Sequence, residues 1–354
     1  MTNPFSAFAR DNIPEIDSVI RGFYDMKIRQ ARWPFMKDMY ADLAAYCLRE
    51  GKRIRPLLLL LACDGYGKGR GARDEMIRIA ASLEMMHSFL LIQDDIIDRA
   101  VMRRNEKAFH VVTGEKYGAL TCNDRLGTDV ALVLADVLFA NALEIVASAD
   151  ICNRARKRFL GIFSGTYEMT AWGQVLDSLN TMPKKISITE NIPLRISTLK
   201  TAYYTIYYPL LMGYVLSTPG GEREQDALRE FALPLGLSFQ IRDDILGVFG
   251  DEKETGKSTD SDLLEGKITL LIQYTLETLK GKARSDFMNL VLKTGKTKKD
   301  VKTMRTTIRE SGSLEKTTMQ QSRFLEEARG KLDGLTLNKK YRHILAGLID
   351  MLSA

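Results

Sequence analysis

The sequence predicts an all-α protein, and three observations support that prediction. Long apolar-rich runs recur along the chain with few proline or glycine interruptions, as helices of a buried bundle require. Segments that alternate apolar and polar residues between tight turns, the pattern typical of strands, are not found. Glycine and proline instead gather between the runs. The expected helices cover Leu57–Cys63, Ile77–Ile97, Val130–Ala149, Phe159–Leu179, Ile196–Leu216 and Ala227–Phe249.

The segments between these helices predict the loops and the domain organisation. Loops are expected at Gly65–Gly71, Thr181–Pro193 and Thr218–Gly221. A polar stretch punctuated by glycine, Gly250–Gly266, follows the last of the six helices, and helical patterns resume at Ile268. Because no linker divides the chain, residues 1–354 are expected to form one helical domain.

Composition and charge limit the kind of protein. Of the 354 residues, 45% are hydrophobic and 27% are charged, as in ordinary soluble globular proteins. The net charge is +6, with short basic clusters at 154–158 and 293–302. No nucleic-acid recognition motif accompanies this charge, and anionic small substrates explain it equally well. We therefore expect no nucleic-acid partner.

The spacing of the cysteines and the apolar segments indicate the cellular compartment of the protein. The four cysteines form no CxxC pair, so they indicate neither a zinc site nor a disulfide framework. They are Cys47, Cys63, Cys122 and Cys152. The N-terminus lacks the pattern of a secretory signal, and the most apolar segment, Val130–Ala149, is interrupted by polar residues. A cytoplasmic protein without a transmembrane segment is therefore expected.

The most informative feature is a pair of aspartate clusters, Asp94–Asp98 and Asp243–Gly247, each within an apolar segment. Burying carboxylates there is costly unless a cation neutralises them. Asp94 and Asp98 are four residues apart, which places both on one face of a helix. Carboxylate oxygens suit Mg²⁺, which commonly holds substrate phosphates as well. The clusters predict a metal site that handles a diphosphate, with a solvated helix face as the alternative.

Cationic and polar side chains accompany the clusters. Gly51–Pro56 places three cations before an apolar helix, with Pro56 suited to its first turn. Arg103 and Arg104 follow the first cluster, and the planar guanidinium of arginine suits a phosphate. Taken singly, each of these cations could be an ordinary exposed side chain. His87, which precedes the first cluster among apolar residues, could be a core histidine. The other elements are Gly173–Asp177, Lys200-Thr201, Phe239-Gln240, Lys257 and Lys267.

This ordered set, from Gly51 to Lys267, resembles the trans-isoprenyl diphosphate synthases of the polyprenyl synthetase family, and most of all a short-chain geranylgeranyl diphosphate synthase. The resemblance implies a large helical bundle of the isoprenoid synthase type with a central active-site cavity. It implies a prenyltransferase that condenses isopentenyl diphosphate head-to-tail with dimethylallyl, geranyl or farnesyl diphosphate and releases diphosphate. It also implies Mg²⁺ as the cofactor, with three ions in each active site.

The resemblance further implies a role for each matching residue. The metal ligands would be Asp94, Asp98 and Asp243, supported by Asp95, Asp244, Gln174 and Asp177. The allylic diphosphate would contact Arg103, Lys200, Lys257 and Lys267. The diphosphate of isopentenyl diphosphate would contact Lys52, Arg55, His87 and Arg104. The catalytic residues would be Lys200, Thr201 and Gln240, with the oxygens of the last two near the allylic cation.

Two positions depart from the family pattern. Gly247 ends the second cluster where many members have a third aspartate, and activity is expected to survive this change. Glu50 stands where a further glycine commonly precedes Gly51, which weakens only the match in backbone flexibility.

Product length is expected to depend on the apolar floor beneath the first cluster. Phe89, five residues before Asp94, and Met86 lie on one helical stripe. Phe89 followed by the non-aromatic Leu90 resembles the arrangement associated with geranylgeranyl products. The alternatives are a farnesyl or longer product, with Phe89 a simple core residue.

Other classes of protein remain as alternatives at this point. They are a class I terpene cyclase, a non-catalytic regulatory subunit, and a calcium-binding or structural helical protein. The first would lack the basic motif at Lys52–Arg55, and the second would have lost one or both clusters. Because the family is commonly homodimeric, a homodimer is expected. The loop Gly250–Gly266 is expected to close over the site, since a carbocation must be shielded from water.

Overall fold

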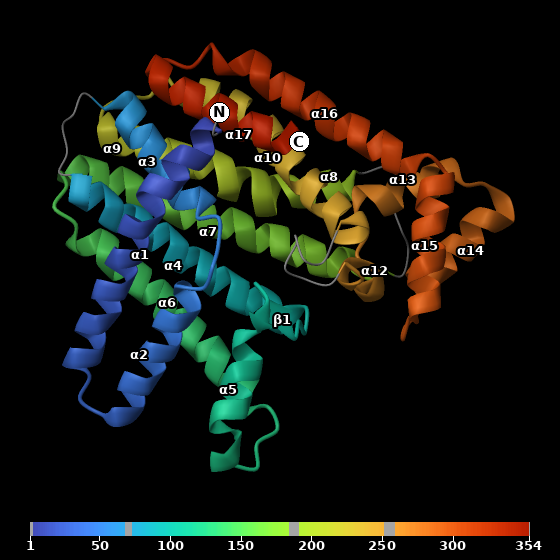
Figure 1. The fold of residues 1–354 in the computed structure, drawn as a ribbon, viewed down its shortest axis with the longest axis horizontal. Helices are drawn as coiled ribbons and strands as arrows, with labels where there is room; N and C mark the ends of the chain where they lie inside the picture. Colours follow the sequence, from blue (N-terminus) through green and yellow to red (C-terminus); the bar gives the residue numbers. More distant parts are fainter. Residues whose placement is uncertain (1–2, 68–72, 184–190, 251–258, 354) are drawn as a thin grey trace. The chain divides into compact units, whose positions relative to one another are not determined.

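The structure is a computed structural model, and it describes residues 3–67, 73–183, 191–250 and 259–353. Helices make up most of these residues (Figure 1). The strands found in the described ranges are two strands of two residues each. The prediction of an all-α fold is confirmed.

The chain divides into two compact units, and each is assembled from segments that are distant in the sequence. The first unit contains Met1–Gly161, Pro209–Gly221 and Leu337–Ile344, and the second contains Ile162–Tyr208, Glu222–Thr336 and Leu345–Ala354. Three helices contribute residues to both units. They are α7 (Asn153–Asn180), α9 (Tyr208–Ser217) and α17 (Lys339–Ser353).

The first unit is built around α4 (Arg73–Ile97), the helix that leads into the first aspartate cluster. This helix packs against α1, α3 and α6, and α5 packs on α6. The side chains from Leu57 to Ala62 in α3 have no exposed surface, so this helix forms part of the core. The other elements are α1 (Pro4–Gln30), α2 (Pro34–Cys47), α3 (Ile54–Tyr66), α5 (Phe109–Tyr117), the 3-10 turn η1 (Gly118–Leu120) and α6 (Leu126–Ser148).

A short β-hairpin follows α4, which the sequence analysis did not predict. Its strands, β1 (Met102–Arg103) and β2 (Glu106–Lys107), pair antiparallel through the two-residue loop of Arg104 and Asn105. Both loop residues have positive φ, 55° and 61°, as a type I′ turn requires. Two-residue strands are too short to carry an alternating pattern, so periodicity could not predict them.

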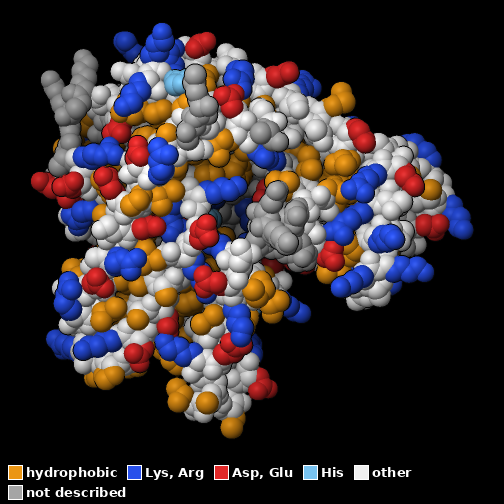
Figure 2. Space-filling view, in the orientation of Figure 1, with side chains coloured by type: hydrophobic (Ala, Val, Ile, Leu, Met, Phe, Trp, Pro, Cys, Tyr) orange, Lys and Arg blue, Asp and Glu red, His pale blue; other side chains and the backbone are white. Residues whose placement is uncertain are grey.

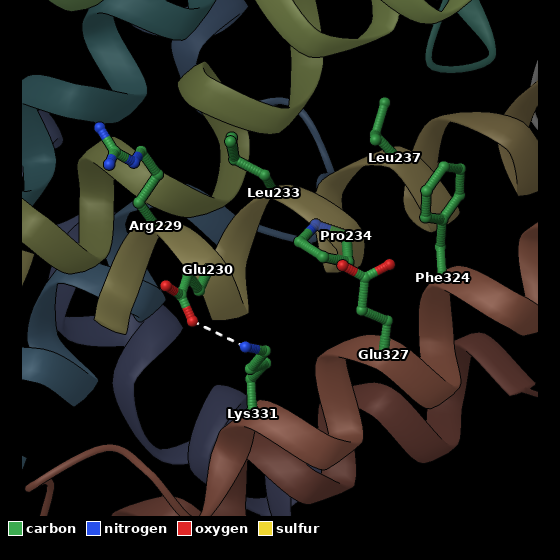
Figure 3. A pocket seen from close by; sticks show the side chains of 8 residues that line it. All are labelled: Arg229, Glu230, Leu233, Pro234, Leu237, Phe324, Glu327 and Lys331. Carbon is green, nitrogen blue, oxygen red and sulfur yellow. Dashed lines mark hydrogen bonds and ion pairs between the residues drawn. The ribbon is translucent and has the colours of Figure 1, made fainter. Parts of the chain in front are cut away.

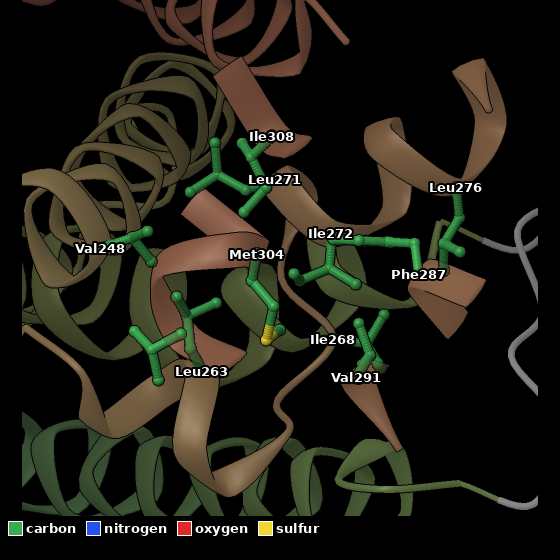
Figure 4. Close-up of a cluster of buried hydrophobic side chains, with 11 residues drawn as sticks. Val248, Leu263, Ile268, Leu271, Ile272, Leu276, Phe287, Val291, Met304 and Ile308 are labelled. Atoms are coloured by element: carbon green, nitrogen blue, oxygen red, sulfur yellow. The ribbon is translucent and has the colours of Figure 1, made fainter. Parts of the chain in front are cut away.

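The second unit is organised around α10 (Gln225–Phe249), which packs against α16 and η2. Its other elements are α8 (Ile192–Ser197), the π-helix η2 (Thr198–Tyr207), α12 (Ser261–Glu265), α13 (Leu270–Thr278), α14 (Gly281–Val291), α15 (Lys298–Glu310) and α16 (Ser313–Leu332). Buried side chains of α10, α12, α13, α14 and α15 converge on one cluster (Figure 4). Burial of this apolar surface holds the C-terminal helices to the end of α10. The cluster consists of Val248, Leu263, Ile268, Leu271, Ile272, Leu276, Phe287, Val291, Val301, Met304 and Ile308.

Five of the six expected helices are found with extended boundaries, and Ile196–Leu216 differs. This run is divided into α8, η2 and α9, and the Tyr208 amide donates to the Tyr203 carbonyl, five residues back. Pro209 has no amide hydrogen, and its ring crowds the carbonyl four residues before it, so a regular α-helix is disfavoured here. The loop at Thr218–Gly221 is confirmed, while the other two expected loops lie partly outside the described residues.

The basic excess of the chain is concentrated in the second unit. Residues 280–310 contain ten Lys and Arg and three Asp and Glu, a net charge of +7, whereas the whole chain has +6. Lys and Arg side chains gather over α14 and α15 (Figure 2). The remainder of the chain is close to neutral, so the cations near the aspartate clusters are balanced by acids.

Among the described residues, α6 is long and apolar enough to cross a membrane by length and composition alone. Of its most apolar 18 residues, 44% are buried, and the helix packs against α4 and α5. This packing agrees with the expected bundle helix. The absence of a transmembrane segment stays a prediction.

Candidate active site

The first aspartate cluster lies at the C-terminal end of α4. Asp94 and Asp95 occupy the last turn, and Asp98 follows Ile97, the last helical residue. The negative end of the helix dipole lies here, so these carboxylates are disfavoured by the dipole and by one another. Asp95 is buried, whereas Asp94 and Asp98 are half-buried. The arrangement still requires cations.

Arg103 of β1 supplies one of these cations. Its Nε donates to Asp95 Oδ1 at 2.7 Å, and its Nη2 donates to Asp94 Oδ2 at 3.2 Å and also to Asp95. Burial raises the pKa of Asp95, and Arg103 offsets only part of that rise. Burial lowers the pKa of Arg103, but the charge of Asp95 outweighs it and raises that pKa above its ordinary value. Asp95 therefore anchors Arg103 rather than facing solvent.

The donor set at this cluster fits Mg²⁺ with a phosphorylated substrate. In the described ranges, no group of three or more His, Cys, Asp and Glu side chains is gathered closely enough to hold a metal. Asp94 in the last turn of α4 and Asp98 just after it offer carboxylate oxygens from residues four apart. Mg²⁺ is commonly bound by one or two carboxylates, with water and substrate phosphates completing its octahedron. A shared protein–substrate site therefore suits these residues better than a metal held by protein alone.

The cations of Gly51–Pro56 have different surroundings. Arg53, the residue before α3, has φ 48° and is buried, with ion pairs to Asp17 and Glu84. Lys52 is exposed and Arg55 is half-buried. Arg53 is thus committed to the interior, whereas Lys52 and Arg55 keep solvent-accessible surface on either side of it.

Arg104 and His87 lie in the same unit as these cations. Arg104 Nη2 donates to Glu84 Oε1 at 3.3 Å, and His87 is half-buried on α4, three residues after Glu84. Burial, followed by the positive charges of four arginines, holds the pKa of His87 well below its ordinary value. These arginines are Arg55, Arg104, Arg103 and Arg53. A neutral imidazole among cations indicates a positive potential, which favours a polyanion.

In the second unit, a chain of hydrogen bonds joins the second cluster to the π-helix. Thr201 Oγ1 donates to Gln240 Oε1 at 2.5 Å, and Gln240 Nε2 donates to Asp244 Oδ1 at 2.7 Å. Asp243 is exposed and Asp244 is half-buried. The chain fixes the side-chain amide of Gln240 and assigns Asp244 to support, while Asp243 stays accessible.

Lys200 precedes Thr201 in η2, and its Nζ pairs with Asp177 Oδ2 of α7 at 3.0 Å. Two glycines allow neighbouring helices to approach this segment. A Cβ on Gly173 would lie 2.8 Å from the Lys200 amide nitrogen, and a Cβ on Gly236 of α10 would lie 2.4 Å from the Ala202 Cα. Such close approach requires glycine. Gln174, next to Gly173, is half-buried.

Gly247 has a neighbour that the sequence did not suggest. A Cβ at this position would lie 2.9 Å from Asp262 Oδ2, so a carboxylate of α12 occupies the space beside it. Lys267 follows α12 and pairs with Glu265 at 3.0 Å, and its backbone forms an isolated bridge with Thr181. Lys257 lies outside the described residues, as do residues 251–258 of the stretch expected to close.

The residues predicted to set product length are buried in the first unit. Phe89 is 2% exposed and Met86 has no exposed surface. The Phe89 ring contacts that of Phe139 in α6, with centroids 5.1 Å apart and planes inclined at 39°. Such a pair is both a core contact and a rigid apolar wall.

A shallow hollow of about 280 Å³ lies between α10 and α16 (Figure 3). The Glu230–Lys331 ion pair crosses one side of it, and apolar side chains line the rest. None of the predicted site residues lines it. Its lining consists of Arg229, Glu230, Leu233, Pro234, Leu237, Phe324, Glu327 and Lys331.

An all-α fold with two aspartate clusters, the first paired with Arg103 and the second hydrogen-bonded to Gln240, is compatible with enzymes that act on diphosphates with a divalent metal. Residues 37–308 match the family model of the polyprenyl synthetases, and the chain belongs to this family. The resemblance seen in the sequence is confirmed, and with it, at the level of the family, the prediction of a prenyltransferase.

Named relatives support the same family. A geranylgeranyl diphosphate synthase of Saccharolobus solfataricus is 34% identical over 64% of this chain, and the match spans 63% of that relative's length. A geranylfarnesyl diphosphate synthase of Aeropyrum pernix is 32% identical over 85% of this chain and 89% of its own. Among solved structures, geranylgeranyl pyrophosphate synthase from Corynebacterium glutamicum, complexed with isoprenyl diphosphate and magnesium, has a TM-score of 0.87 and 27% identity. That match covers 96% of this chain and 97% of the other.

The sequence analysis did not single out three acids that the structure brings to these residues. Glu84 pairs with Arg53 and Arg104, Asp17 pairs with Arg53, and Asp262 lies against Gly247. The sequence could have indicated Glu84, since it lies three residues before His87 on the same helical face. Asp17 and Asp262 meet their partners only through tertiary packing.

Proposed function

We propose that the protein catalyses the Mg²⁺-dependent condensation of isopentenyl diphosphate with an allylic diphosphate, with release of diphosphate. The observation that carries this proposal is the pairing at the end of α4. There, Arg103 pairs with Asp94 and with the buried Asp95, in a chain whose residues 37–308 match the polyprenyl synthetases. The Corynebacterium glutamicum relative binds isoprenyl diphosphate and magnesium, which supports the same ligands here.

In this proposal the metal ligands are Asp94, Asp98 and Asp243, with three ions in each active site. Bound Mg²⁺ would offset the negative charge that develops on the departing diphosphate. Arg103, Lys200 and Lys267 would donate hydrogen bonds to the allylic diphosphate, as would Lys257. Acids already orient the charged groups of Arg103, Lys200 and Lys267, as in the Lys200–Asp177 pair, so these three need little reorganisation when charge develops.

Thr201 and Gln240 would place their oxygens near the allylic cation. Their hydrogen bond to one another, and the bond from Gln240 to Asp244, hold both oxygens at fixed orientation. Fixed oxygen dipoles stabilise a carbocation without capturing it. The alkene of isopentenyl diphosphate then attacks C1 of the allylic group, and loss of a proton restores an alkene.

The second diphosphate, that of isopentenyl diphosphate, would be bound by Lys52, Arg55, His87 and Arg104. The surroundings of His87 support this assignment, because burial first and then the charges of nearby arginines lower its pKa. A neutral His87 would donate one hydrogen bond to a phosphate oxygen.

Incubation with isopentenyl diphosphate, Mg²⁺ and each allylic primer in turn tests the reaction. We expect a prenyl diphosphate product and release of inorganic diphosphate. The absence of prenyl product with every primer would defeat the proposal. Hydrocarbon formed from an allylic diphosphate alone would instead favour a class I terpene cyclase.

We propose geranylgeranyl diphosphate as the product. The buried pair of Phe89 and Phe139 supports a floor that stops growth of the chain. The named relatives include both geranylgeranyl and geranylfarnesyl synthases, so family membership alone leaves the length open. Phe89→Ala should lengthen the product, which mass analysis would measure. Unchanged product length in folded Phe89→Ala protein would reject the floor.

We also propose that residues 1–354 act as one catalytic domain in a cytoplasmic homodimer. The outward face of α6 supports a second copy as partner, since Leu132 and Val133 are 46% and 60% exposed there. All four cysteines are free, which agrees with a reducing compartment. Sedimentation of wild type against Val133→Glu tests the dimer. A monomeric wild type at micromolar concentration would reject it.

A further inference from the structure

Two arginines of the first unit share one buried carboxylate. Arg53 Nη1 and Arg104 Nη2 both donate to Glu84 Oε1, at 2.8 Å and 3.3 Å. Glu84 is 1% exposed, and a carboxylate so deeply buried is retained only when cations and hydrogen bonds satisfy it. Glu84 is not among the residues that contact substrate in the function proposed above.

The two arginines are not equally constrained. Arg53 is 3% exposed, and it is also held by Asp17 Oδ1 at 3.0 Å and by the carbonyls of Cys47 and Arg49 at 3.0 Å and 2.9 Å. Two carboxylates and two backbone carbonyls hold its guanidinium, so Arg53 acts as a fixed support. It has no surface left with which to bind a ligand.

Arg104 is held more lightly and keeps 18% of its side chain exposed. Apart from Glu84, its guanidinium has a 3.5 Å contact with the Arg49 carbonyl, which is at the limit of a hydrogen bond. Arginine has five N–H donors, so donors remain for a ligand once Glu84 has fixed the orientation. The direction of Arg104 therefore depends chiefly on Glu84.

Gly51 is matched to this pair. A Cβ on Gly51 would lie 3.0 Å from the Arg104 guanidinium carbon and 3.0 Å from Arg53 Nη1. The backbone of the basic motif thus packs directly on both guanidinium groups, and a side chain there would displace them. Glu84 of α4 therefore contacts the basic motif through Arg53 and the hairpin through Arg104.

We propose that Glu84 is a positioning residue for the isopentenyl diphosphate site and acts through Arg104. This inference rests on the function proposed above. Glu84 holds Arg104 on one side and the immobile Arg53 on the other, and His87 lies one turn further along the same helix. Loss of its charge frees the Arg104 guanidinium without removing any group that contacts the diphosphate.

Glu84→Gln tests the proposal, because it keeps the size of the side chain and removes the charge. We expect the KM for isopentenyl diphosphate to rise by about 10-fold, as for loss of a supporting contact. We expect kcat and the KM for the allylic diphosphate to change less than about 2-fold. Calorimetric binding of isopentenyl diphosphate should weaken by a similar factor. An unchanged KM and binding constant, or an equal rise for both substrates, would overturn the proposal.

Asp17→Asn is the matched control, because Asp17 pairs with Arg53 alone. It should lower thermal stability and leave the KM for isopentenyl diphosphate unchanged. A rise equal to that of Glu84→Gln would show that both acids only stabilise the fold. If Glu84→Gln does not fold, Glu84→Asp replaces it, because aspartate keeps the charge on a shorter side chain. The same KM and binding measurements then decide the proposal.

A double-mutant cycle with Arg104→Gln separates positioning from a direct role. If Glu84 acts through Arg104, the double variant should bind isopentenyl diphosphate no more weakly than Arg104→Gln alone. Additive losses would overturn the proposal. Failure of wild type to form any prenyl product rejects the proposed function, whereas normal turnover with insensitive Glu84 variants rejects only this inference.

Discussion

The two aspartate clusters differ in what balances their charge. The first lies at the negative end of α4, and a cation, Arg103, pairs with Asp94 and the buried Asp95. The second lies within α10, and a neutral amide, Gln240, supports Asp244 while Asp243 stays exposed. Among the described residues, Arg103 thus supports the first cluster by an ion pair, and Gln240 supports the second by a hydrogen bond from a neutral amide.

This difference predicts that substitutions in the two clusters affect stability and activity to different extents. A partly buried ion pair fixes geometry, but removing one partner leaves a charge without compensation. Loss of a hydrogen bond from a neutral amide, such as that from Gln240 to Asp244, reduces the free energy of unfolding by less. The first cluster should therefore be sensitive in both stability and activity, and the second chiefly in activity.

The largest effect should come from the accessible carboxylates. Asp94→Asn should lower kcat/KM by about 10³-fold or more, because it removes one of two carboxylates on the face of α4. Asp243→Asn should lower it by about 10²-fold, since that residue is the one accessible carboxylate of its pair. Steady-state kinetics at saturating Mg²⁺ would measure both, with circular dichroism to establish folding. Wild-type activity in either folded variant would exclude that residue as a metal ligand.

The second aspartates of the two clusters should differ in stability. Asp95→Ala should reduce the free energy of unfolding by about 3 kcal/mol, because Arg103 loses its buried partner. Asp244→Ala should cost about 1.5 kcal/mol, the lower end of the range for a hydrogen bond in which only the acceptor is charged. Urea denaturation of both variants gives the comparison. Equal losses would contradict the distinction between ionic and neutral support.

Acid should weaken the first unit through His87. Its pKa is lowered in the folded state, so below the unfolded value of about 6.5 the unfolded chain binds more protons. Stability is therefore full above pH 6.5 and falls as the pH decreases, by at most about 1.4 kcal/mol per pH unit. His87→Gln should remove this part of the slope between pH 7 and pH 5. The same slope in the variant would show that other groups account for it.

The smallest effect should be at Gly247. In Gly247→Ala, the gain in helix propensity of about 1 kcal/mol offsets the movement of Asp262, so stability should change by less than about 1 kcal/mol. Gly247→Asp should be less stable than Gly247→Ala, because it brings a second carboxylate against Asp262. Thermal melts of the two variants test this order. Greater stability in the aspartate variant would show that the site accommodates a third carboxylate.

Periodicity and motif order predicted the helical class, five of the six helices and the residues that carry the family match. They did so because burial of an apolar face sets the helical pattern, and because the motif residues are close to one another in sequence. Pairs such as Arg53–Asp17, 36 residues apart, depend on packing that no local pattern encodes. The π-helix at Lys200 was missed for the related reason that Pro209 and two close glycines act together.

The hairpin of residues 102–107 must keep its length if both of its arginines are to reach their partners. Its loop is two residues, and Arg103 reaches the aspartates while Arg104 reaches Glu84. A single inserted residue would shift the strand pairing by one position and turn each side chain to the opposite face. Substitutions at the exposed positions of this hairpin should therefore be tolerated, whereas an insertion or a deletion within residues 102–107 should not.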